Sequence, residues 1–82
     1  MSPYIVKTRR VEIDEGDPPQ VMGELTYVYY KLALAYIADR GQSFQSIGEA
    51  VGALEATKQE LYRRVGGPYE DQKLIANGDV IG

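Results

Sequence analysis

The stretch from Pro18 to Arg40 limits the fold most, because a helix with its pattern needs cover on more than one side. Charged residues are few in it, and apolar side chains recur at alternating spacings of three and four. A helix that is apolar nearly all round is buried on several sides. The apolar residues form three stripes: Val21, Leu25, Val28, Leu32 and Ala35; Met22, Tyr29, Ala33 and Tyr36; and Tyr27, Tyr30, Leu34 and Ile37.

Signals at both ends predict that this first helix spans residues 18–40. Asp17 can accept hydrogen bonds from the free N–H groups of the first turn, and proline is tolerated at the first helical position. Gly23 is the only weak helix former inside the stretch. Gly41 then provides a residue that adopts the left-handed conformation that commonly ends a helix.

A second helix is predicted over residues 43–65, with Ser43 as its cap. Its apolar residues keep the spacing of a coiled-coil seam, which suits antiparallel packing on the first helix. A parallel row of small residues, Gly48, Gly52 and Ala56, favours close approach of another backbone, and the alternative is a local weak point for bending. The seam consists of Phe44, Ile47, Val51, Leu54, Lys58, Leu61 and Val65.

The length of the chain, 82 residues, allows one small domain over residues 1–82. A chain of this size buries only about 60% of its unfolded surface, so its stability is marginal without further support. There is no cysteine for a disulfide, and no histidine. The sequence therefore predicts a homo-oligomer whose interface is formed by the third stripe of the first helix, namely Tyr27, Tyr30, Leu34 and Ile37.

The two ends of the chain give weaker signals. Residues 1–17 are predicted to form an extended arm, with a short strand or a loop as the alternatives. The dipeptide Gly66-Gly67 followed by Pro68 ends the second helix, and a short third helix follows over residues 68–76. The predicted fold is therefore all-α: an antiparallel helical hairpin, a short C-terminal helix and an extended N-terminal arm, completed by homo-oligomerisation.

Charge and hydropathy exclude several classes of partner. The net charge is −3, and no stripe of lysines and arginines is present, which argues against duplex nucleic acid as a partner. No apolar run approaches the roughly 20 residues of a membrane span, so no membrane partner is expected. No export signal begins the sequence, and a cytoplasmic location is the expectation.

Catalysis is not expected of this sequence. Without histidine or cysteine, the residues Ser43, Ser46 and Thr57 have no obvious base at a fixed spacing. Glu70 and Asp71 are adjacent, so on a helix they point about 100° apart, and a role at the start of a helix explains them better. No metal site and no cofactor are predicted, because the usual ligands and the loop of a calcium site are missing.

Binding of an anion is the more plausible chemistry, at a corner formed by Tyr62, Arg63, Arg64 and Tyr69 around the Gly66-Gly67-Pro68 turn. Guanidinium groups suit phosphate or carboxylate, and tyrosine rings can stack on a base. The alternative is structural, since both arginines can pair with Glu60, Glu70 and Asp71 and offset the helix dipole.

The second half of the chain resembles a family of small uncharacterised proteins from phages and bacterial genomes. The resemblance lies in the run Ala53–Val65, which contains Leu-Tyr-Arg-Arg-Val, followed by Pro68-Tyr69-Glu70-Asp71 and Asn77-Gly78-Asp79-Val80. It covers most of the chain from Tyr36 onward, and Pro3-Tyr4-Ile5 matches the way members begin. Residues 11–19 depart from the pattern. The resemblance implies a phage or prophage origin and a role in the host cytoplasm.

Two functional hypotheses follow. In the first, a small non-enzymatic oligomer binds or sequesters an anionic small molecule, such as a nucleotide signal of host immunity, at the arginine corner. In the second, the protein is an interaction module that assembles with itself or a host protein and has no small ligand.

Overall fold

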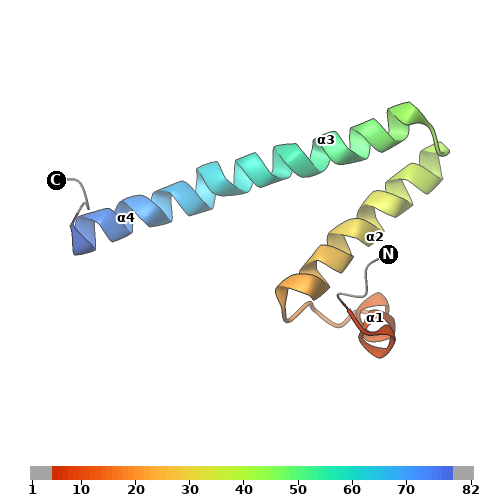
Figure 1. The fold of residues 1–82 in the computed structure, drawn as a ribbon, viewed down its shortest axis with the longest axis horizontal. Helices are drawn as coiled ribbons and strands as arrows, with labels where there is room; N and C mark the ends of the chain where they lie inside the picture. The colour runs from red at the N-terminus through yellow and green to blue at the C-terminus, as the bar shows by residue number, and fades with distance from the viewer. Residues whose placement is uncertain (1–4, 79–82) are drawn as a thin grey trace. The chain divides into compact units, whose positions relative to one another are not determined.

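The computed structural model describes residues 5–78, and every regular element in that range is helical, which confirms the all-α prediction (Figure 1). Two compact units make up the chain, Met1–Ile47 and Gly48–Gly82. In order, the elements are α1 (Lys7–Asp14), α2 (Met22–Arg40), α3 (Phe44–Leu61), the π-helical segment η1 (Tyr62–Gly66) and α4 (Gly67–Asn77).

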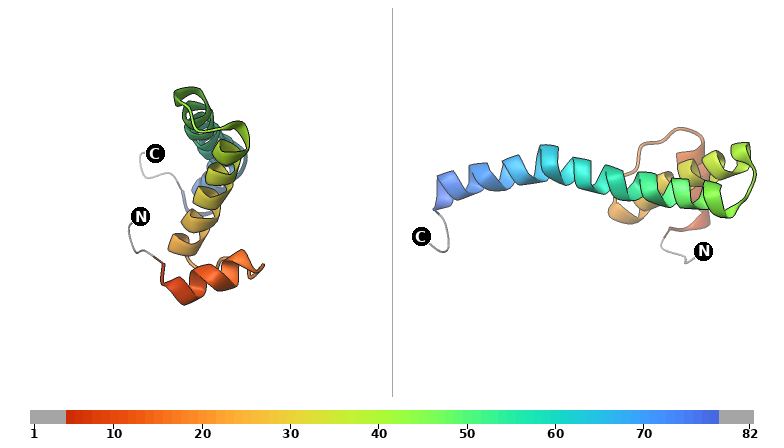
Figure 2. Two further views of the ribbon diagram at one scale, coloured as in Figure 1. Left: turned by 90° about the vertical axis from the view of Figure 1, so that its right-hand side faces the viewer. Right: turned by 90° about the horizontal axis from the view of Figure 1, so that it is seen from above.

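The first helix corrects the prediction of an extended arm over residues 1–17. Lys7–Asp14 is the α-helix α1, although no side chain caps its start. It lies across the N-terminal end of α2 (Figure 2). An isolated helix of this length is marginal in water, so packing rather than local propensity explains why it forms. The part of the predicted arm that precedes Ile5 lies outside the described residues.

Tyr27 is the centre of the small core of the first unit. It is 4% exposed and packs with Ile5 and Ile13, with Val28 partly buried beside them. Its hydroxyl donates a hydrogen bond to the Asp14 carboxylate, whose Oδ1 lies 2.8 Å away. Of the predicted interface stripe, Tyr27 is thus already buried within its own chain.

α2 begins later than predicted, at Met22 instead of residue 18. Asp17 does not cap the helix, because its carboxylate pairs with Arg9 of α1 instead. Glu24 is in the first turn, and its Oε1 accepts a hydrogen bond from the backbone N–H of Gln20 at 2.9 Å. The predicted end is confirmed, since the helix stops at Arg40 and Gly41 has a φ of 88°.

The start of α3 confirms the capping role of Ser43. Its Oγ accepts a hydrogen bond from the backbone N–H of Ser46 at 3.0 Å, and Ser46 Oγ accepts one from the N–H of Ser43 at 3.0 Å. Ser46 Oγ also donates to the carbonyl of Gly41 at 2.9 Å. This reciprocal arrangement satisfies free N–H groups at the helix start and explains why the Ser46 side chain is buried.

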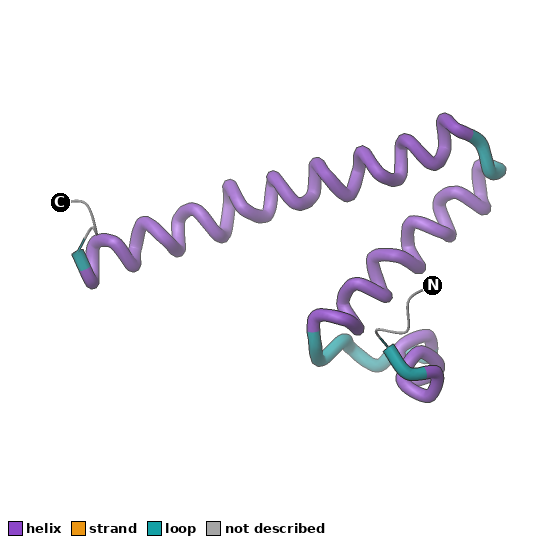
Figure 3. Tube along the Cα trace, in the orientation of Figure 1, coloured by secondary structure: helices purple, strands orange, loops and turns teal. Residues whose placement is uncertain are grey.

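The predicted break at Gly66-Gly67-Pro68 is wrong. Gly66 and Gly67 both have right-handed helical angles, and the helix runs without a loop from α3 through η1 into α4 (Figure 3). The N–H of Gly67 bonds to the carbonyl of Tyr62, five residues earlier. Pro68 cannot donate to a carbonyl one turn back, so the wider π-type turn accommodates it within a continuous helix. α4 ends at Asn77, one residue beyond the predicted end at residue 76, and Gly78 has a φ of 81°.

Among residues 5–78, no helix is both long enough and apolar enough to cross a membrane.

Candidate functional site

Both arginines of the predicted corner reach the same acid, Glu60. Arg63 Nη2 lies 2.9 Å from each carboxylate oxygen of Glu60, and Arg64 Nε donates to Oε1. Side chains three and four residues apart are neighbours on a helix, so Glu60 meets both arginines one turn later. The structure thus brings Arg63 and Arg64 together and also confirms the predicted alternative that they pair with Glu60.

Exposure of the arginines is high in spite of this pairing. Their side chains are 70% and 72% exposed, and that of Glu60 is 48% exposed. Ion pairs this open to water contribute little to stability. The two guanidinium groups carry one more charge than the carboxylate they share, so the cluster keeps a net positive charge.

Tyr62 is directed to an acid further along the helix. Its hydroxyl donates to Glu70 Oε2 at 3.1 Å, which raises the pKa of Tyr62 above 10.0 because the bond favours the neutral phenol. A Cβ at residue 66 would lie only 3.2 Å from Cδ2 of the tyrosine. Gly66 therefore leaves room for the ring to lie against the π-helical segment.

Tyr69 stands apart from the arginines in the structure. Its ring is 58% exposed, and Lys73 Nζ lies 5.6 Å from its centroid. An open depression on this helix includes Tyr62 and Arg63 but not the other two predicted residues. The residues that line it are Ala56, Lys58, Gln59, Glu60, Tyr62 and Arg63. This depression therefore does not gather all four predicted residues.

Charges next to the arginine pair are largely matched. Lys58 Nζ lies 3.3 Å from Glu55 Oε1, and Gln59 Nε2 donates to the same oxygen at 3.3 Å. The hydrogen bond from Gln59, followed by that from Lys58, lowers the pKa of Glu55. The local positive excess around Glu60 thus lies at Arg63 and Arg64.

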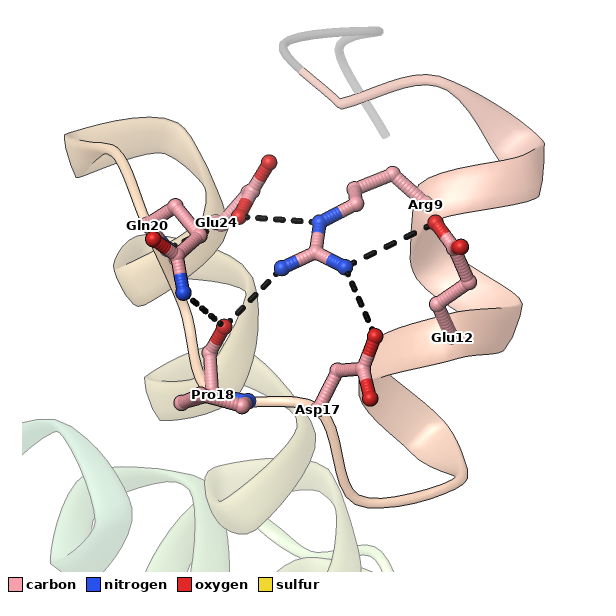
Figure 4. Close-up of polar contacts among 6 residues, drawn as sticks. All are labelled: Arg9, Glu12, Asp17, Pro18, Gln20 and Glu24. Carbon is pink, nitrogen blue, oxygen red and sulfur yellow. Dashed lines mark hydrogen bonds and ion pairs between the residues drawn. The ribbon is translucent and has the colours of Figure 1, made fainter.

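A second polar cluster, around Arg9, was not predicted. Arg9 Nε lies 3.0 Å from Glu24 Oε1, and Nη2 donates to the carbonyl of Pro18 at 2.9 Å (Figure 4). Nη1 lies 3.2 Å from Asp17 and 3.5 Å from Glu12. One guanidinium thus joins α1, the connecting loop and the first turn of α2, and its donors are taken up by the chain itself.

Glu24 in the Arg9 cluster has a shifted pKa. Its pKa is lowered below the ordinary value of 4.5, first by the backbone N–H of Gln20 and then by Arg9. The pKa of Arg9 is raised in turn, chiefly by the hydrogen bond to Glu24. Each group favours the charged form of the other, so the cluster stabilises the α1–α2 connection and is not a free binding site.

One sequence signal marks this cluster in retrospect. Arg9 and Ile13 are four residues apart, which places them on one face of α1, and Ile5 lies just before the helix begins at Lys7. The isoleucines are buried with Tyr27, while Arg9 lies between them and reaches Glu24. A single cation between two apolar residues in the sequence indicates a segment that packs against an acidic neighbour.

The hydroxyl groups considered for catalysis form hydrogen bonds within a helix or at its start. Ser43 and Ser46 bond to each other at the start of α3, and Thr57 Oγ1 donates to the carbonyl of Ala53 at 2.7 Å. In the described part of the chain, acidic side chains do not gather in a group of three that could hold a metal ion. Anion binding is the chemistry that the arginine pair supports.

No curated protein and no solved structure matches this chain. A family match, by contrast, extends over nearly its whole length. Residues 1–80 match the domain of unknown function DUF6899, and the chain belongs to that family.

Proposed function

We propose that this protein is a non-enzymatic helical module that assembles with other copies of itself. The observation that supports the proposal is the exposure of large apolar side chains on α2 and α3. Leu34 is 41% exposed, and Val51, Leu61 and Val65 are all more than half exposed. Large apolar side chains exposed along a helix are typical of sites of protein association.

Unit Gly48–Gly82 strengthens the argument, because its described elements form a single run of helix. One helix has no second layer against which to bury its seam, and helices in proteins are stabilised mainly by such packing. The seam suits antiparallel packing of α3 on α2 as a hairpin. We propose that copies then associate through the remaining stripe of α2, which contains Tyr30, Leu34 and Ile37.

Light scattering at increasing protein concentration tests the assembly. We expect a mass above that of the monomer for the wild type, and a shift towards the monomer for Leu34→Asp, because a carboxylate in an apolar interface must lose its water. Ile75→Asp is the matched control, since Ile75 lies on α4 outside the seam and is 86% exposed. A monomeric wild type at high concentration would refute self-assembly.

A second function is favoured by the convergence of Arg63 and Arg64 on one carboxylate. Two guanidinium groups that share an acid can equally share an anionic ligand. On this proposal the protein binds or sequesters an anionic small molecule such as a nucleotide signal. A phage or bacterial origin, which the resemblance of the C-terminal half implies, and a cytoplasmic location fit such a role.

Isothermal titration tests this second function with a nucleoside monophosphate and a cyclic dinucleotide as probes. We expect binding that is weakened at least severalfold in Arg63→Ala and nearly lost when Arg64 is also replaced, since charge-assisted hydrogen bonds are the strong ones. Lys7→Ala is the control, because it removes the same charge from an exposed position on α1. Equal heats for the wild type and the double variant would exclude the site.

A further inference from the structure

Glu60 occupies the place that an anionic ligand of the arginine pair would take. Both of its carboxylate oxygens accept from Arg63, and Oε1 also accepts from Arg64. Arg63 Nη2 and Arg64 Nε, the donors that converge on one point, are therefore used by an anion of the chain itself. A ligand can bridge the two arginines through these donors only when this carboxylate leaves.

Acids on either side of Glu60 are held by other partners. Glu55 accepts from Lys58 and Gln59, and Glu70 accepts from the Tyr62 hydroxyl. Of these three acids, Glu60 is thus the one that pairs with the two arginines. Its side chain is 48% exposed, so it can rotate into water without a buried charge being left behind.

We propose that Glu60 is a built-in competitor that closes the arginine pair until a ligand with a phosphate group displaces it. The inference rests on the anion-binding function proposed above. A tethered group acts at an effective concentration on the order of millimolar or higher, so weakly bound anions do not displace it. A terminal phosphate carries about −1.5 to −2 charges and three strong acceptor oxygens, enough to engage both guanidinium groups.

Glu60→Gln tests this role, because it removes the charge and keeps the shape of the side chain. Isothermal titration uses AMP, inorganic phosphate and adenosine as probes. We expect AMP and phosphate to bind about fivefold more tightly to Glu60→Gln than to the wild type, the range expected when two exposed ion pairs are lost. Adenosine separates recognition of the phosphate from recognition of the base.

Glu55→Gln is the matched control, since it removes the same charge from the same helix five residues earlier. Its affinity for AMP should equal that of the wild type, which excludes a general effect of net charge. Circular dichroism of each variant checks that the helix is retained.

The possible failures are distinguishable. If the wild type binds AMP through Arg63 and Arg64 but Glu60→Gln binds with equal or lower affinity, Glu60 is not a competitor and the inference is overturned, while the anion site stands. If neither protein binds AMP or phosphate, the anion site itself is refuted, and the inference falls with it.

Discussion

Replacing Tyr27 with alanine is expected to unfold most of the α1–α2 unit. The side chain is 4% exposed and contacts the two isoleucines that complete the core. Truncation of a buried aromatic residue costs about 3 to 5 kcal/mol. That is a large share of the roughly 5 to 15 kcal/mol that stabilises a typical domain.

Urea titration followed through the amide NMR signals of α1 measures this loss, because circular dichroism sums over all the helices. Tyr27→Phe isolates the hydroxyl bond to Asp14 and should cost only about 1 kcal/mol. Tyr69→Ala is the exposed control and should change stability by no more than about 0.5 kcal/mol. If Tyr27→Ala left the α1 signals and their midpoint unchanged, the assignment of the core would be wrong.

Arg9→Met should detach α1 from α2, with a smaller loss of stability than Tyr27→Ala. The substitution keeps the apolar part of the side chain but removes every donor that joins Glu24, Asp17 and the Pro18 carbonyl. Those acceptors must then return to water. Lys7→Met is the matched control, since it removes the same charge two residues earlier at an exposed position.

The dependence of stability on pH carries the signature of the Arg9 cluster. The pKa of Glu24 in the folded protein is below 4.5, so the unfolded chain binds the proton more readily. The contribution of Glu24 is therefore complete above about pH 4.5 and is lost as the pH falls through the folded pKa.

Thermal unfolding measured between pH 3 and pH 7 tests this dependence. Arg9→Met should lose less stability in acid than the wild type, and Glu24→Gln should lose less still. The reason is that the Gln20 N–H also lowers the Glu24 pKa, and only Glu24→Gln removes that effect. Identical acid profiles for all three proteins would contradict the role of the cluster.

The long helices could be predicted from the sequence because their signals are local. Apolar spacing indicated α2 and α3, Ser43 marked a start, and Gly41 marked an end. Each signal acts within one or two turns of the backbone. Such signals do not depend on which elements later meet.

α1 and the start of α2 depended on contacts that the sequence does not display. Residues 7–14 contain β-prone and basic side chains, and they become helical where Ile5, Ile13 and Arg9 meet Tyr27 and Glu24. Asp17 is a good cap by type, but an arginine eight residues earlier binds it. Tertiary packing outweighed local propensity at both places.

The candidate site was predicted in part. The sequence placed Arg63 and Arg64 near Glu60, because residues three and four apart meet on any helix. It did not place Tyr62 on Glu70, eight residues away, since that contact needs the helix to continue past two glycines and a proline. Those residues ordinarily end a helix, so the continuation could not be inferred.

The π-helical segment Tyr62–Gly66 also acts as a phase shift in the helix. A turn closed by an i→i+5 bond holds about one residue more than an α-turn, so every side chain beyond it is rotated backwards by about one position. Tyr69 therefore falls near the angular position that residue 68 would hold in a plain α-helix. That is the next position of the seam after Val65, so the extra residue places an aromatic ring in line with the seam instead of a proline.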